Sequence, residues 1–197
     1  MVTATNLTAD RSEIRRDLVY MTRRWHELGR PTLMEIRAFK EGRTPQTQKY
    51  DPAWMDDAVE FAAGMNAHGY NIYAVRNPIK ADCKGSASDE DIAAAFFLWA
   101  DCDDEGAAGN VLRFGGPKWT AAVTTGKTPS TRVHVYWELF EPCLDLAAWR
   151  QMQSDIAAHF QSDRTVINPS RIMRVGGTVS WPADQKRQRG YIDELTT

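Results

Sequence analysis

The segment that most constrains this chain is an apolar run that ends in two closely spaced acids. Residues 95–100 (AFFLWA) are continuously apolar, and Asp101, Cys102 and Asp103 follow directly. Such a run is typical of a strand that is buried on both faces. Because side chains i and i+2 of a strand project from the same face, we expect Asp101 and Asp103 to point together and Cys102 to point the opposite way.

Two carboxylates this close repel each other, and either protonation or a divalent cation relieves the repulsion. Oxygen ligands of this kind suit Mg²⁺ or Mn²⁺, which keep several waters and also bind substrate phosphates. The alternative interpretation is a solvated, inert acidic turn at a strand end. The buried strand favours a ligand site, but the acids alone leave both interpretations open.

A second polar stretch lies on a strand that we predict at residues 132–139. Arg132, His134 and Tyr136 share one face of this strand. The opposite face carries apolar residues that we expect in the core: Val133, Val135 and Trp137. A histidine beside an arginine suits a phosphate contact, but a single histidine is more often structural. His134 is therefore a candidate phosphate-binding residue only together with the two acids.

A third cluster of charged residues lies near the C-terminus, where Asp163 precedes Arg171 and Arg174. Residues 164–190 contain six Lys or Arg residues and one acid, a local charge of +5. Basic side chains beside an acidic metal site suit a polyphosphate or a nucleic-acid backbone. The alternative, a charged and partly mobile tail, applies best to residues 186–189.

The composition is that of a globular chain. The chain has 197 residues, a net charge of −2 and 43% hydrophobic residues, which is enough to form a core. A charge near zero argues against a protein that coats nucleic acid indiscriminately. Its three cysteines are never spaced as CxxC, which excludes a disulfide framework or a zinc ribbon. Without a membrane-length apolar run or a signal pattern, we expect a cytoplasmic protein with no membrane partner.

Periodicity and capping residues predict an α+β fold, because strands and helices interleave without regular βαβ alternation. We expect helices at residues 10–29, 51–69 and 145–160, and strands at 33–39, 71–75, 95–101, 120–125, 132–139, 165–167 and 171–175. Residues 40–49 and 106–117 are expected to be loops.

Taken in order, the three polar clusters resemble the motifs of the archaeo-eukaryotic primase superfamily, particularly the primase domains of plasmid and phage replication proteins. Residues 97–103 (FLWADCD) resemble its first motif, a hydrophobic strand that ends in DxD. Residues 130–134 (STRVH) resemble the second motif, and Asp163 with residues 171–178 (RIMRVGGT) resembles the third. Residues 71–73 (NIY) and 77–78 (NP) are similar to a stretch that precedes the acids in these relatives. The resemblance spans residues 33–182.

The resemblance implies an RRM-like antiparallel sheet with flanking helices, which agrees with the α+β prediction. It implies a catalytic set of Asp101, Asp103, Asp163 and His134, in which the three aspartates hold two Mg²⁺ or Mn²⁺ ions. It also implies a set of residues that bind the nucleotide phosphates or the template: Arg132, His134, Arg171 and Arg174. Related sequences often have Asp at the position of Asn168, so the third ligand is either Asp163, which we favour, or the Asn168 position. Many relatives have RxPG where residues 174–177 read RVGG, so this turn is expected to differ.

The function implied is that of a DNA primase or primase-polymerase in plasmid or phage replication, with single-stranded DNA and NTPs or dNTPs as partners. Residues 1–197 would form one catalytic domain, with an N-terminal helix at 1–30, a core at 31–182 and a basic tail at 183–197. A replicative helicase would act in trans or as a further C-terminal domain. Tyr73, Tyr136 and Trp119 suit base stacking, although core packing is the commoner role of such residues.

Two alternative functions fit parts of the same sequence. In nucleotide-sugar transferases a DxD motif holds Mn²⁺ against a diphosphate, but that function leaves His134 and the later arginines unexplained. A non-catalytic RRM-like nucleic-acid binder would expose aromatic side chains on its central strands, where this chain has Asp101 and Asp103.

Overall fold

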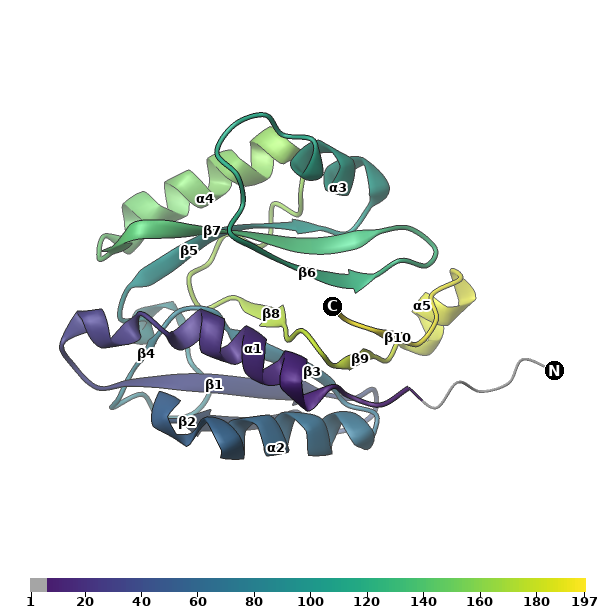
Figure 1. Cartoon of the computed structure of the whole chain (residues 1–197), viewed down its shortest axis with the longest axis horizontal. Coiled ribbons are helices and arrows are strands. Elements are labelled where there is room, and N and C mark those ends of the chain that lie inside the picture. Colours follow the sequence, from purple (N-terminus) through teal and green to yellow (C-terminus); the bar gives the residue numbers. More distant parts are fainter. Residues whose placement is uncertain (1–6) are drawn as a thin grey trace.

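The computed structural model describes residues 7–197 and contains two large antiparallel sheets. Helices cover the outer face of each sheet, and the first helix of the chain runs at the level between the two sheets (Figure 1). The first sheet has the strand order β2-β1-β3-β8, with β4 also paired to β1, and the second has the order β5-β7-β6. The predicted α+β class with an antiparallel core is therefore confirmed. No helix within residues 7–197 is both long and apolar enough to cross a membrane.

The first half of the chain builds most of the first sheet. Its elements are α1 (Arg11–Thr22), η1 (Trp25–Leu28), β1 (Thr32–Phe39), β2 (Gln46–Tyr50), η2 (Pro52–Trp54), α2 (Met55–Ala67), β3 (Asn71–Val75) and β4 (Ile79–Lys80). Asp10 starts α1 because its carboxylate accepts hydrogen bonds from the N–H groups of Ser12 and Glu13. Asp51 caps η2 in the same way, and η2 leads directly into α2. Gly29, in the left-handed region at φ 61°, closes η1.

The second half builds the other sheet and then returns to the first. Its elements are η3 (Asp89–Asp91), β5 (Ala95–Cys102), α3 (Glu105–Leu112), β6 (Ala121–Gly126), β7 (Arg132–Cys143), α4 (Leu146–Phe160), β8 (Ile172–Arg174), β9 (Val179–Ser180), α5 (Asp184–Gln188) and β10 (Glu194–Leu195). The long strand β7 pairs with β5 on one side and β6 on the other. A core of its own packs between this sheet and helices α3 and α4: Ala100, Cys102, Ala107, Ala108, Val111, Val133, Val135 and Phe160.

The C-terminal segment connects the two sheets. Strand β8 extends the first sheet beside β3, and β10 pairs with β9. Thr197 then exchanges both backbone hydrogen bonds with Thr124 on the outer edge of β6. Residues 183–197, expected to form a charged tail, therefore contain helix α5 and strand β10 (Figure 1).

Three of the predicted local structures are wrong. The expected loop at 40–49 contains β2, a polar edge strand whose pairing with β1 rather than an apolar pattern defines it. The expected connection at 106–117 contains α3, in which two glycines lower the helix propensity, and Asp104 caps its first turn. The expected strand at 165–167 is absent because the Asp163 carboxylate accepts a hydrogen bond from the N–H of Thr165 and forms a turn.

The predicted helix boundaries are only partly right. The α-helical part of the first helix ends at Thr22, and a 3₁₀ turn completes the predicted range. In α4, the apolar side chain of Met152 is 39% exposed, whereas Gln153 is buried. A buried glutamine breaks the apolar periodicity, and its partners explain its position.

Gln153 satisfies the free edge of β5, which is the outermost strand of its sheet. Its side-chain oxygen accepts a hydrogen bond from the N–H of Trp99 (3.0 Å), and its amide donates to the carbonyl of Trp99 (2.6 Å). The indole N–H of Trp149, one turn earlier on α4, donates to the carbonyl of Phe97 (2.8 Å). Side chains of α4 thus replace the missing neighbouring strand.

The same edge is held at both ends by loops. The side-chain oxygen of Asn77 accepts from the N–H of Phe96 (3.1 Å), and its amide donates to the carbonyl of Pro169 (2.9 Å). At the other end, the N–H of Asp163 donates to the carbonyl of Asp101 (3.1 Å). The backbone of β5 is therefore fixed up to the first of the two acids.

Replacing Gln153 by Leu is expected to lower the free energy of unfolding by about 2–4 kcal/mol, because it leaves the N–H and carbonyl of Trp99 buried without partners. Urea denaturation measures this loss. The same change at exposed Gln151 should cost less than about 0.5 kcal/mol. Equal effects of the two substitutions would show that the edge contact does not stabilise β5.

Candidate active site

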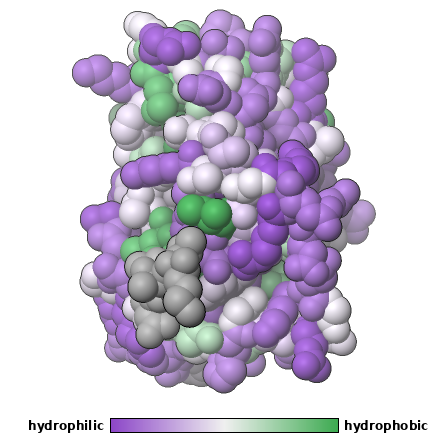
Figure 2. All heavy atoms as spheres, turned by 90° about the vertical axis from the view of Figure 1, so that its right-hand side faces the viewer, coloured by the Kyte–Doolittle hydropathy of each residue, from purple (hydrophilic) through white to green (hydrophobic). Residues whose placement is uncertain are grey.

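A cleft of about 300 Å³ opens where the acid-bearing end of the second sheet meets the C-terminal segment. Five predicted site residues line it: Asp101, Asp103, Arg132, His134 and Arg174. Asp163 and Arg171 lie outside its walls. The face of the molecule that carries α5 is mostly hydrophilic (Figure 2).

The sheet register brings the first acid and the histidine together. Asp101 on β5 lies opposite His134 on β7, and Nε2 of His134 is 3.3 Å from Oδ1 of Asp101. Both side chains are largely buried, but this contact does not meet hydrogen-bond geometry, and Oδ1 of Asp101 and Nδ1 of His134 have no hydrogen-bond partner. A buried carboxylate oxygen without a partner is a candidate cation ligand.

The two acids have opposite electrostatic environments. Burial alone would raise the pKa of Asp101, but contact with His134, aided by the charges of Arg171 and Lys186, outweighs burial and lowers that pKa. Asp103 lies at the exposed mouth of the cleft, where partial loss of water and the charge of Asp101 raise its pKa. The repulsion expected between the two acids therefore raises the pKa of Asp103 and not that of Asp101.

Cys102 points away from the cleft, as the strand alternation predicts, and is buried in the core beneath α3. Burial, with the charges of Asp101 and Asp104, raises the pKa of its thiol to about 12, so the thiol stays protonated at neutral pH.

The backbone N–H of Asp163 bonds to the carbonyl of Asp101, but the side chain of Asp163 bonds to Thr165. Its Oδ1 accepts from both the N–H and the hydroxyl of Thr165, each at 2.8 Å. Its charge still contributes to the raised pKa of Asp103. The side chain of Asn168 instead donates to Ser170 (3.0 Å). Within residues 7–197, no three His, Cys, Asp or Glu side chains converge into a metal-binding group.

The two arginines of the cleft are held differently. Arg174 Nη1 donates to Asn71 Oδ1 and its Nη2 to the Tyr73 hydroxyl, both at 2.8 Å. Residues 71–73 (NIY) thus position the guanidinium of Arg174. Arg132 is buried, and its guanidinium is bonded to the carbonyl of Thr128 (2.7 Å) and to Glu194 (3.1 Å). Arg132 therefore holds the β6–β7 turn to the C-terminal segment.

Lys186 is a cleft residue that sequence reasoning did not place in the site. It lies on α5, lines the cleft, and its charge reaches both Asp101 and Asp103. The local charge of +5 was the only available signal, and it could not distinguish a site residue from a solvated tail. Tyr191 also lines the cleft, and its ring centroid lies 4.4 Å from Cζ of Arg132.

The arrangement brings hard oxygen donors and fixed cations into one cleft. Carboxylates at Asp101 and Asp103 suit a divalent cation, which commonly binds one or two protein carboxylates and the phosphates of its substrate. Arg174 and Lys186 present positive charge to the same space. The site is therefore suited to a metal-bound polyphosphate.

In EDTA, which keeps metal out of the site, substitutions of the two acids should change the free energy of unfolding in opposite directions. Asp103→Asn relieves repulsion at a solvent-screened position and should stabilise the fold by about 0.5 kcal/mol. Asp101→Asn loses the attraction of His134 and should destabilise it by about 1 kcal/mol. Thermal unfolding at neutral pH measures both; two shifts of the same sign would contradict this electrostatic description.

Comparisons with known proteins identify the fold. The sequence matches no family profile and no curated protein. Among solved structures, the primase-polymerase domain (AEP domain) of cyanophage S-2L is similar at 21% identity and a TM-score of 0.65, over 97% of this chain and 91% of that one. The primase RepB' is similar at 10% identity and a TM-score of 0.62, over 93% of this chain and 55% of that one. The RepB' catalytic domain in complex with initiator DNA is similar at 11% identity and a TM-score of 0.55, over 91% of this chain and 85% of that one. This chain therefore has the fold of the archaeo-eukaryotic primases, as its motifs imply.

Proposed function

We propose that this protein is a primase-polymerase that transfers nucleotides from NTPs or dNTPs to a 3′-hydroxyl on a single-stranded DNA template. One observation carries the proposal: Asp101, Asp103 and His134 share a cleft with Arg174 and Lys186, in a fold that solved primase domains also have. The structure of RepB' with initiator DNA supports DNA as the partner. The cyanophage relative supports a role in phage or plasmid replication.

The residues of the cleft fit the expected pair of Mg²⁺ or Mn²⁺ ions. Asp101 offers a buried oxygen without a hydrogen-bond partner, and Asp103 lies on the same strand face. Asp163 would be the third ligand, because both of its hydrogen bonds use Oδ1 and leave Oδ2 for a cation. When bound, the ions would lower the pKa of the attacking hydroxyl and stabilise charge on the leaving pyrophosphate.

The basic residues have separate tasks in this proposal. Arg174, fixed by Asn71 and Tyr73, binds the triphosphate of the incoming nucleotide together with Lys186, which lines the same cleft. His134 orients Asp101 and contacts the phosphates. Arg171 contributes charge toward Asp101, and Arg132 shapes the turn beside the cleft. Prepositioned donors of this kind stabilise charge without reorganisation during the reaction.

Incorporation of labelled NTPs and dNTPs on primed and unprimed single-stranded DNA tests the proposal. The wild type should form products with Mg²⁺ or Mn²⁺, and Asp101→Asn/Asp103→Asn should reduce the rate at least about a thousandfold, as expected when the charges that hold the catalytic ions are lost. Asp82→Asn makes the same change on an exposed loop outside the cleft and should be fully active.

Products on the unprimed template would establish primase activity, and products only on the primed template would establish polymerase activity alone. A wild type that binds DNA but forms no product on either template would contradict the proposal and favour a binding module. Transfer from a UDP-sugar by the same acids would contradict it in favour of a sugar transferase.

Divalent metal binding gives a second test that does not depend on turnover. Mn²⁺ should raise the Tm of the wild type and of Asp82→Asn, because a ligand that binds only the folded state stabilises it. At a concentration one hundred times the Kd, the stabilisation is about 2.7 kcal/mol. The Asp101→Asn/Asp103→Asn protein should show no rise; an equal rise in both would place the metal elsewhere.

A further inference from the structure

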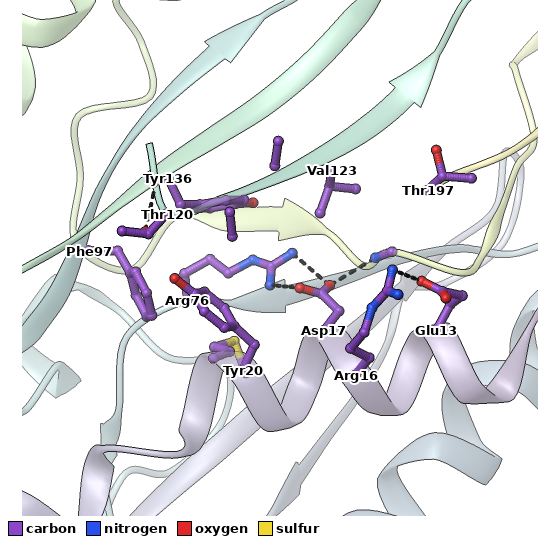
Figure 3. Close-up of a pocket in the computed structure, with 14 residues that line it drawn as sticks. Glu13, Arg16, Asp17, Tyr20, Arg76, Phe97, Thr120, Val123, Tyr136 and Thr197 are labelled. Carbon is purple, nitrogen blue, oxygen red and sulfur yellow. Dashed lines mark hydrogen bonds and ion pairs between the residues drawn. The ribbon is translucent and has the colours of Figure 1, made fainter. Parts of the chain in front are cut away.

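A second cavity, of about 220 Å³, lies between α1, the start of β6 and the turn that follows β8 (Figure 3). Tyr20, Phe97 and Tyr136 give it three aromatic walls, and consecutive ring centroids are 5.7 and 6.3 Å apart. None of these residues lines the catalytic cleft. Both sites nevertheless share β7, because Tyr136 is two residues from His134.

Two buried polar atoms at this cavity lack a hydrogen-bond partner. They are Nε of Arg76 and the hydroxyl of Tyr136, whose residues are only 2% and 3% exposed. In Figure 3 the two side chains extend from opposite sides into the same space. The two groups are neighbours, since each acts on the pKa of the other through a side-chain hydrogen bond. The Tyr136 oxygen can accept from Arg76, but the Tyr136 hydroxyl proton then still has no acceptor. Because buried polar groups are nearly always satisfied, this indicates one missing acceptor at the cavity.

The charged side chains at this cavity are already paired with one another. The guanidinium of Arg76 forms two hydrogen bonds to Asp17, at 2.7 and 3.0 Å, and Arg16 pairs with Glu13. Burial raises the pKa of Tyr136, which keeps its hydroxyl protonated at neutral pH. A ligand that accepts from the Tyr136 hydroxyl should therefore be neutral.

We infer from strand alternation that the edge of β6 adds one backbone N–H and carbonyl. Thr124 exchanges both hydrogen bonds with Thr197 on this edge, so the alternation of antiparallel strands turns the N–H and carbonyl of Ala122 to the same edge. The N–H of Thr120 turns inward to the carbonyl of Tyr136 (2.8 Å). One free residue is too short a site for an added strand, but it can pair with a flat molecule that has an acceptor and a donor side by side.

We propose that this cavity binds a nucleobase, in a site separate from the catalytic cleft. The rings of Tyr20 and Phe97 pack on a flat ring, Ala122 recognises its hydrogen-bonding edge, and the Tyr136 hydroxyl donates to one of its acceptors. The volume is below the roughly 300–1,000 Å³ of pockets for drug-sized ligands, which suits one ring system. The base belongs to a free nucleotide or to a nucleic-acid strand.

Calorimetric titration with the five common nucleosides, in EDTA, tests this site. Without phosphates or metal, the nucleosides have little to bind in the catalytic cleft. Tyr136→Phe removes only the orphan hydroxyl, so it should retain or raise the Tm while weakening nucleoside binding about three- to tenfold. Ala121→Leu fills the cavity and should abolish binding, whereas Tyr70→Phe, outside the cavity, should leave it unchanged.

A tetranucleotide serves as a second ligand and distinguishes the two sources of the base. Nucleoside binding that depends on Tyr136 indicates a free nucleotide, and Tyr136-dependent binding of the tetranucleotide alone indicates a strand; either supports the site. If neither ligand shows this dependence, the proposal is overturned. Repeating the titrations with Asp101→Asn/Asp103→Asn should give the same affinities, so a failure of the catalytic proposal is distinguishable from a failure of this one.

Discussion

The structure depends on how the free edge of β5 is satisfied. This strand is the outermost of its sheet, yet its backbone is buried, and exposed edges or unpaired buried groups are both unfavourable. Gln153 pairs with both backbone groups of Trp99, and Asp163 closes the ladder at the carbonyl of Asp101. These bonds hold the strand against α4 and the following loop up to Asp101, the first of the two acids.

That rigidity allows the site to hold unfavourable charge. The pKa of Asp103 is raised and that of Asp101 is lowered, because only Asp101 has His134 opposite it. The C-terminal segment completes the cleft by supplying Lys186 and by holding Arg132 through Glu194. The repulsion that destabilises the metal-free protein is the property that would make the cleft bind divalent cations, which is a common compromise between stability and function.

Local patterns predicted the parts of the structure in which a residue's neighbours in sequence determine its role. The apolar run before Asp101 and the alternation of β7 predicted the buried strand, the opposite faces of Asp101 and Cys102, and the core position of Val133 and Val135. Long-range contacts could not be read in this way. Gln153 interrupts an apolar stripe to cap a strand 54 residues away, and β2 is a strand only because β1 lies beside it. Lys186 reaches the cleft because the segment containing β9, α5 and β10 turns back, which no local signal encodes.

We propose that Asp101 and Asp103 hold the catalytic metal beside His134 and Arg174. Fe²⁺ substituted for Mg²⁺ generates hydroxyl radicals with peroxide and cuts the backbone near the bound ion, and mass spectrometry locates the cuts. We expect cleavage around residues 101–103 and 134, which excess Mg²⁺ should suppress and which should be absent from the Asp101→Asn/Asp103→Asn protein. Mg²⁺-sensitive cleavage at another part of the chain, with residues 101–103 intact, would contradict it.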